Sequence, residues 1–205
     1  MSTSETKTAI AQALAPLFPG FRYVQEEGFE REIPGGSQKI SLPVSDYGAF
    51  SKFSLVFCVR LNAVEQILDR FSGSPPEYQS MTVTSMTPLA YFFPDKSGTK
   101  QYRIETPSDL RNVVAELATR KDEFLRFLDT HRDVRALDAA MNSPGGAAFD
   151  NSNQPYRAMH AVILARLAKN ERFDEIVKQY RTEAQEWHKE SRDQYERLVE
   201  YLEQL

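Results

Sequence analysis

Hydrophobic and polar residues alternate more strictly between Phe50 and Leu61 than anywhere else in the chain. One set of alternating positions is apolar and comprises Phe53, Leu55, Phe57, Val59 and Leu61. The other set comprises Lys52, Ser54, Cys58 and Arg60. A strand with one apolar face is typical of an antiparallel sheet that packs one face on a core. The pattern therefore predicts that Phe50–Leu61 is the central strand of such a sheet.

Three shorter strands are predicted before this central strand. Residues 21–25 and 29–33 alternate on either side of the turn Glu26-Glu27-Gly28, which is typical of a β-hairpin. A third alternating run, 38–44, follows the turn-forming segment Pro34-Gly35-Gly36-Ser37. Four consecutive strands with short turns predict a meander.

Short elements are also predicted after the central strand. Asn62-Ala63-Val64-Glu65 has the form of a helix N-cap that is followed by an acidic residue in the first turn. A threonine-rich run from Tyr78 to Met86 predicts another strand, and Pro88 marks an edge or a bend before a further apolar run at Leu89–Phe93. The last strand is expected at Tyr102–Ile104.

From Thr106 onward, the predicted structure is helical. Thr106 is a candidate cap, with Pro107 at the first helical position and Asp109 at the third. Tyr156–Ala168 is apolar nearly all round, which predicts a helix sandwiched between neighbours. Apolar residues then recur in steps of three and four from Phe173 to Leu202, which predicts one long amphipathic helix over about Glu171–Gln204.

The predicted fold class is α+β, with an antiparallel meander sheet packed on helices and a helical C-terminal half that ends in a long amphipathic helix. Residues 1–141 are expected to form the α+β domain. Residues 142–155 are rich in Gly, Pro, Asn and Ser and are expected to be a flexible loop. Residues 156–205 are expected to be a helical segment packed on the same domain.

Composition and charge exclude several classes of function. The 205 residues carry a net charge of −4, and the segment 171–205, with ten acidic and six basic residues, accounts for it. A neutral body with an acidic end does not suit a phosphate backbone, so no binding to nucleic acid is expected. No signal peptide and no apolar run long enough to span a membrane is recognisable, and the single cysteine does not favour an oxidising compartment. A cytoplasmic location without membrane binding is expected.

The sequence shows no clear catalytic or metal-binding constellation. His131, His160 and His188 are far apart, and no glycine-rich loop has the spacing of a phosphate site, so neither a metal nor a cofactor is predicted. Cys58 lies in mid-strand, where a structural thiol is favoured over a nucleophile. His160 is either a general base or a buried imidazole bonded to a backbone carbonyl, and the second is favoured.

The acidic hairpin residues offer one further possibility for chemistry. They could act as paired acid and base, although solvated hairpin charges are the favoured interpretation. The residues concerned are Glu26, Glu27, Glu30 and Glu32. No catalytic residue is assigned.

The C-terminal helix is the predicted partner-binding element. A helix over 171–204 would span on the order of 50 Å, more than the roughly 30 Å diameter of a small domain, so its apolar stripe would overhang. The stripe either folds back after a break near Ser191 or contacts a partner protein or a second copy of the chain, and the unbroken spacing favours contact. The candidate partner-binding residues are Trp187, Tyr195, Leu198 and Leu202. Tyr91-Phe92-Phe93 is another candidate patch, for which packing in the core is preferred.

The runs GFRYVQEEGFERE and FSLVFCVRLNAVEQIL, followed by the late helical segment, resemble those of a group of bacterial domains of unknown function. Some members of that group resemble immunity proteins, which neutralise toxins from neighbouring cells. The resemblance implies a cytoplasmic, non-enzymatic protein-binding module, and acidic surfaces suit basic partners such as nuclease toxins. The alternative is a small-ligand-binding protein or an enzyme with a pocket between sheet and helices.

Overall fold

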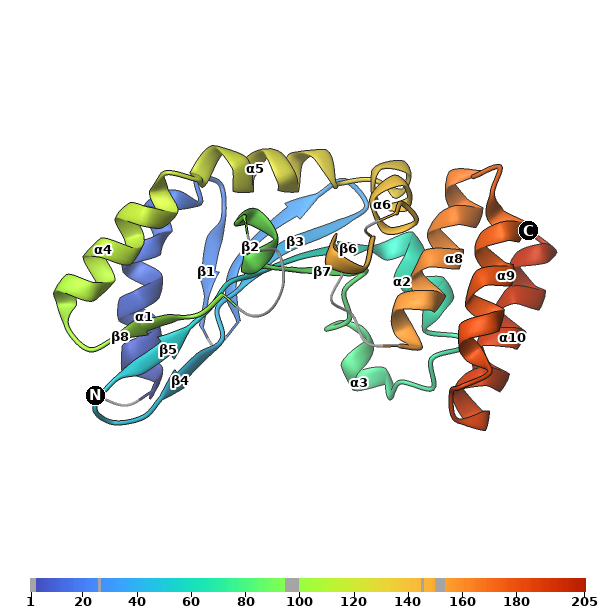
Figure 1. The fold of residues 1–205 in the computed structure, drawn as a ribbon, viewed down its shortest axis with the longest axis horizontal. Coiled ribbons are helices and arrows are strands. Elements are labelled where there is room, and N and C mark those ends of the chain that lie inside the picture. The colour runs from blue at the N-terminus through green and yellow to red at the C-terminus, as the bar shows by residue number, and fades with distance from the viewer. Residues whose placement is uncertain (1–2, 26, 95–99, 145, 150–153) are drawn as a thin grey trace. The chain divides into compact units, whose positions relative to one another are not determined.

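The structure is a computed structural model that describes residues 3–25, 27–94, 100–144, 146–149 and 154–205 (Figure 1). Its architecture is α+β, as the sequence predicts, with antiparallel strand pairs and a helical C-terminal half. The chain divides into two compact units. The first comprises Met1–Cys58 and Thr87–Thr130, and the second comprises Val59–Met86 and His131–Leu205. These units differ from the three consecutive ranges expected from the sequence, because each is built from two separate stretches.

The larger sheet has five strands in the order β1-β2-β3-β6-β7. Its strands are β1 (Arg22–Val24), β2 (Gly28–Ile33), β3 (Gly36–Ser41), β6 (Val56–Leu61) and β7 (Ser85–Pro88). The predicted hairpins are confirmed, since Arg22 pairs with Glu30 across the first and Phe29 pairs with Ile40 across the second. Pro88 ends the edge strand β7, where the lack of an N–H is tolerated.

A second sheet interrupts the predicted meander. It has the order β4-β5-β8, and its strands are β4 (Val44–Asp46), β5 (Ser51–Phe53) and β8 (Tyr102–Ile104). The prediction of one central strand over Phe50–Leu61 is therefore wrong, because the stretch supplies β5 to one sheet and β6 to the other. At the junction, the Ser54 hydroxyl donates to the Lys100 carbonyl (2.7 Å) and the Ser54 N–H donates to the Pro43 carbonyl (3.3 Å).

The predicted apolar face of this stretch is nevertheless confirmed. All five of its alternating residues are buried, namely Phe53, Leu55, Phe57, Val59 and Leu61. Alternation reports which side chains face the core, and it persists when the chain passes from one sheet to another. Cys58, on the other face, is also buried.

Helices and an aromatic core complete the first unit. Its helical elements are α1 (Thr3–Leu14), η1 (Ala15–Leu17), η2 (Leu89–Phe92), α4 (Pro107–Ala118) and α5 (Lys121–Thr130). Phe57 lies 4.7 Å from Phe92 and 5.1 Å from Phe124 between ring centroids. The predicted capping box of α4 is confirmed: Thr106 Oγ1 accepts from the Asp109 N–H (3.2 Å), and Asp109 Oδ2 accepts from the Thr106 N–H (2.8 Å).

Tyr91 and Phe92 belong to the 3₁₀ helix η2, and Phe93 is its C-cap, so the aromatic run 91–93 is not a strand. The three side chains therefore point in different directions. Phe92 is buried, and Tyr91 is half-buried 5.8 Å from Phe127 between ring centroids. Phe93 lies under two cations, Lys100 (4.5 Å from the ring centroid) and Arg120 (4.6 Å). The preferred interpretation, packing of two of the three rings, agrees with this arrangement.

Seven helices lie in the second unit, as far as the structure describes it. They are α2 (Asn62–Leu68), α3 (Pro76–Gln79), α6 (Val134–Met141), α7 (Gly146–Phe149), α8 (Tyr156–Ala168), α9 (Phe173–Ala184) and α10 (Lys189–Glu203). The apolar helix α8 has its predicted bounds, and every side chain from Ala158 to Ala165 is buried. The predicted strand over Tyr78–Met86 is mostly wrong, because Pro76 begins the short helix α3 and β7 starts only at Ser85.

The C-terminal half ends in a long helix, α10, as the sequence predicts, but the prediction that one unbroken helix covers about Glu171–Gln204 is wrong. The chain leaves helical conformation after Ala184 and resumes it at Lys189, and α10 then packs beside α9. The Tyr195 hydroxyl donates to the carbonyl of Val177 (3.3 Å), and Arg181 pairs with Glu196 (3.0 Å). Both helices direct their apolar stripes to the same interior, so the three-four spacing continues across the break.

The predicted flexible loop, 142–155, is described only in part. Residues 145 and 150–153 lie outside the described residues, and the short helix α7 occupies 146–149. Where the chain is described, none of its helices combines the length and the apolar character needed to cross a membrane.

Candidate functional site

Three of the four candidate partner-binding residues are buried in the interior of the second unit. Tyr195, Leu198 and Leu202 are fully buried, and Trp187 is half-buried with its ring 5.6 Å from that of Tyr195. The physical reason is the break after Ala184, which folds the expected overhang back onto α9. The exposed apolar stripe on which their assignment to a partner contact rested is therefore absent from the described part of α10.

A buried polar network, which the sequence did not reveal, connects α2 and α8. Glu65 Oε1 lies 3.1 Å from His160 Nε2, and it accepts a hydrogen bond from the Thr84 hydroxyl (2.6 Å). The same hydroxyl oxygen accepts the N–H of Leu61 (2.9 Å). Glu65 is 0% exposed and His160 is 3% exposed. His160 is thus bound to a carboxylate, whereas the sequence analysis favoured a backbone carbonyl.

The protein stabilises the ionised form of Glu65. Burial raises the pKa of this carboxyl group, but the charge and hydrogen bond of His160, together with the Thr84 hydroxyl, outweigh burial and lower the pKa to about 2. Arg60 Nη1 stands 4.0 Å from Glu65 Oε2 and donates to the carbonyl and hydroxyl oxygens of Thr82 (2.6 and 2.7 Å). Burial, followed by the charge of Glu65, raises the pKa of Asp69.

This network supports the fold better than it supports catalysis. A general base needs access to the proton that it abstracts, and Glu65 and His160 are both buried, with at most 3% of the residue exposed. The expectation of an N-cap at Asn62 is wrong, because Leu61 occupies the cap position without a side-chain bond. Within α2, Glu65 lies one position after Val64 and three before Leu68, and all three are buried, so this spacing was the sequence signal that could have shown the burial of Glu65.

A pocket in the first unit has a different character, since it is open and lined by three distant segments. We call it the α1 pocket. Its volume is about 420 Å³, and α1, the β4–β5 turn and the start of α4 enclose it. Its lining residues are Thr6, Ala9, Ile10, Asp46, Gly48, Ala49, Phe50, Ser51, Ile104, Glu105, Thr106, Pro107 and Leu110. Thr6, Ala9 and Ile10 are spaced to share one face of a helix.

Stacked aromatic rings stand beside this pocket on the β4–β5 turn. Tyr47 is 58% exposed and stacks on Phe50 with 4.9 Å between ring centroids. Arg103 covers the Phe50 ring at 3.7 Å, and Lys52 lies 5.7 Å from the centroid of Tyr47. Asp46 Oδ1 accepts the N–H of Gly48 (2.9 Å) and so fixes the turn.

Two carboxylates line the α1 pocket, and none of its described lining residues is a lysine or an arginine. Asp46 and Glu105 line it, and Asp109 accepts the N–H groups of Thr106 and Glu105, which lower the pKa of its carboxyl group. Glu105 pairs with Arg103 (2.6 Å), whereas no ion pair joins Asp46 to a cation among the described residues. The arrangement can bind a cationic group whose apolar stem lies on Ile10 and Leu110.

No family model, curated protein or solved structure matches this chain.

The acidic hairpin residues that the structure describes are either paired or exposed, and Glu32 is exposed. Glu27 pairs with Lys39 (2.6 Å), whose hydrogen bond lowers the pKa of Glu27, while burial raises the pKa of the nearby Glu30. Glu26 lies outside the described residues. Within the described ranges, no group of three or more His, Cys, Asp or Glu side chains is placed to hold a metal ion. The acidic hairpin is therefore a set of partly solvated charges on β2 and its turn.

Proposed function

We propose that this chain is a non-enzymatic, immunity-like protein-binding module that recognises a basic segment of a partner protein at the α1 pocket. The observation that carries the proposal is that Asp46 and Glu105 line a partly apolar pocket, and that the exposed ring of Tyr47 stacks on Phe50 in the same lining. Aromatic anchors beside desolvated pockets dominate the energetics of protein interfaces. A lysine or arginine side chain fits this combination, because its stem is apolar and its end is cationic.

The charge distribution supports a basic partner. Residues 171–205 hold ten acidic and six basic residues, and they account for the whole net charge of −4. Charge of one sign on a protein accelerates encounter with a partner of the opposite sign and disfavours other partners. A cytoplasmic bacterial protein that binds neither nucleic acid nor membranes is part of the same proposal.

The sealed Glu65–His160 network supports a non-enzymatic role. Neither residue belongs to the lining of the α1 pocket or of the pocket at the end of α8, so the carboxyl group whose pKa is lowered to about 2 lines neither of these two pockets. Perturbed ionisable groups mark active sites when they stand in a cleft. Here the cleft and the perturbed group are separate.

Selection from a displayed library of random peptides tests this function. Peptides enriched on the intact protein are expected to contain Lys or Arg next to an aliphatic or aromatic residue. The double variant Asp46→Asn, Glu105→Gln should bind them at least tenfold more weakly, and the amide oxygen introduced at position 46 can still accept the Gly48 N–H that holds the turn. The control Asp193→Asn, Glu200→Gln removes the same charge from α10 and should weaken binding far less, because it affects only the long-range attraction.

Two results would overturn the proposal. One is a selection that enriches no basic residues, and the other is equal weakening by the α1-pocket variant and the α10 variant, which would indicate general charge attraction without a site. If a gene for a basic toxin lies beside the gene for this chain, that toxin supplies the natural partner for the same measurements.

The size of the pocket favours a second candidate, a small-ligand-binding protein. A volume of about 420 Å³ lies within the range of roughly 300–1,000 Å³ that is common for small-molecule sites. The same chemistry would then select a small cation with an apolar body, and hexylamine is a suitable probe. Tighter binding of hexylamine than of every selected peptide would favour this candidate over protein binding.

A further inference from the structure

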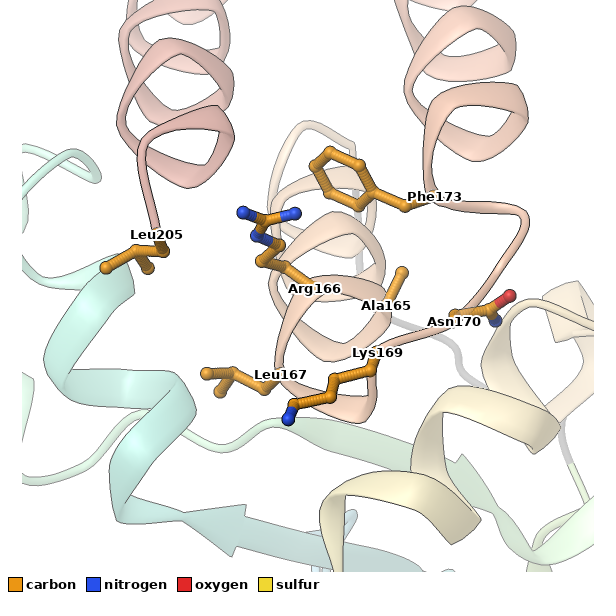
Figure 2. Close-up of a pocket in the computed structure, with 7 residues that line it drawn as sticks. All are labelled: Ala165, Arg166, Leu167, Lys169, Asn170, Phe173 and Leu205. Atoms are coloured by element: carbon orange, nitrogen blue, oxygen red, sulfur yellow. The ribbon is translucent and has the colours of Figure 1, made fainter.

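A second pocket lies in the second unit, at the C-terminal end of α8. We call it the α8 pocket. Its volume is about 550 Å³, and its lining residues are Ala165, Arg166, Leu167, Lys169, Asn170, Phe173 and Leu205. Figure 2 shows Arg166 between the ring of Phe173 and the end of the chain at Leu205, with Leu167 and Lys169 at the other end of the group.

Two cations in this pocket have no anionic partner within the described residues. Arg166 lies over the Phe173 ring with 5.5 Å to the centroid, and no carboxylate approaches it or Lys169 to ion-pair distance in the part of the chain that the structure describes. The neighbouring carboxylate of Asp138 is already bound by two amides, those of Asn142 (2.7 Å) and Asn170 (2.7 Å). Both cations therefore remain available to an incoming anion.

The negative end of the α8 dipole also favours cations at this position, but it offsets only part of their charge. The C-terminal end of a helix favours cations, because its dipole is equivalent to roughly half a negative charge. Arg166 and Lys169 together bring two positive charges to this end of α8. About one and a half positive charges are left, so this end of α8 keeps an excess of positive charge that an anion can neutralise.

The backbone of Lys169 adds a further indication. Its φ of 56° is left-handed, a conformation that glycine adopts at lower cost at a helix C-terminus. Residues kept in such a conformation at some cost cluster at ligand sites. At this position the chain carries a lysine in place of glycine, and its side chain lines the pocket.

We propose that the α8 pocket binds a small organic monocarboxylate with an apolar body. The fork of Arg166 fits a planar carboxylate, Lys169 adds a second positive charge to the pocket, and Leu167 receives the apolar part. This site is independent of the α1 pocket, which lies in the other unit and shares no residue with it.

Chemical-shift titration of the intact protein with hexanoate, acetate and inorganic phosphate tests the proposal. Hexanoate should saturate shifts at Lys169 and Asn170, and it should bind at least tenfold more tightly than acetate, because each buried methylene tightens binding about fourfold. Arg166→Gln and Lys169→Gln should each weaken hexanoate about tenfold. Leu167→Ser should weaken hexanoate and leave acetate unchanged.

Lys178→Gln is the matched control, since Lys178 is an exposed residue of α9 outside the pocket. It should bind hexanoate as the parent does, and thermal unfolding of every variant confirms that it is folded. Equal binding of acetate and hexanoate, tighter binding of phosphate than of hexanoate, or hexanoate binding that survives both cation substitutions would overturn the proposal. None of these results bears on peptide binding at Asp46 and Glu105.

Discussion

Glu65 and His160 are 95 residues apart in the chain, yet their side chains meet in the interior of the second unit with Oε1 and Nε2 at 3.1 Å. Removing a carboxylate from water is costly, so the pair contributes only through its good geometry and the additional bond from Thr84. The network joins α2 to α8, and Thr84 connects it to the segment that leads into β7.

The stability of the second unit should depend on pH through Glu65. The pKa of its carboxyl group is lowered from 4.5 to about 2 in the folded protein, so the stabilisation is complete above pH 4.5 and is lost as the pH falls toward 2. The loss is on the order of 3 kcal/mol. Denaturant unfolding at a series of pH values measures it.

Glu65→Gln isolates this contribution. The variant should be less stable than the parent at pH 7 by about 2–4 kcal/mol, and the difference should vanish near pH 2. The exposed control Glu171→Gln should follow the parent at every pH. Parallel curves for the parent and Glu65→Gln would show that the carboxylate is not stabilised as described.

Local signals predicted much of the fold. The capping residues Thr106 and Asp109 predicted the start of α4, the turn around Gly28 predicted a hairpin, and uniform apolarity predicted the bounds of α8. In each case the residues that carry the signal lie within a few positions of the element that they predict. Periodicity also predicted which residues are buried.

Non-local relationships escaped the sequence analysis. Alternation through Ser54 does not tell which strand a segment pairs with, so the second sheet was missed. Residues 185–188 contain no Gly or Pro, and the break between α9 and α10 depends on packing of Tyr195 against α9. The α1 pocket brings together residues near positions 10, 46 and 105, and no spacing in one sequence reveals such a meeting.

Gly28 should be far more sensitive to substitution than Gly20. Both have a positive φ, but a Cβ on Gly28 would collide with the carbonyl oxygen of Ile40 on β3, whereas Gly20 has open space around it. Gly28→Ala should lower the free energy of unfolding by about 3 kcal/mol and Gly20→Ala by about 1 kcal/mol. Denaturant unfolding measures both, and equal losses would contradict the close approach of β2 and β3.

Leu198 tests whether the stripe of α10 serves the interior or a partner. Leu198→Ala should cost about 2–5 kcal/mol, because it leaves a cavity among side chains that are fully buried. The sedimenting mass should equal that of the parent. The exposed neighbour Arg197→Ala should change stability by less than about 0.5 kcal/mol. A lower sedimenting mass for Leu198→Ala without loss of stability would instead indicate that Leu198 contacts a second chain.

Lys169 should show opposite effects on stability and on ligand binding. Lys169→Gly removes the cost of a left-handed side-chain residue and should raise the free energy of unfolding by about 0.5–1 kcal/mol. Lys169→Ala keeps that backbone cost and should be no more stable than the parent. Both variants lose the ammonium group, so both should bind hexanoate about tenfold more weakly, as measured by chemical-shift titration. Equal free energies of unfolding for Lys169→Gly and Lys169→Ala would show that the backbone of Lys169 is not strained. Hexanoate binding by both variants as tight as that of the parent would show that the ammonium group has no part in the α8 pocket.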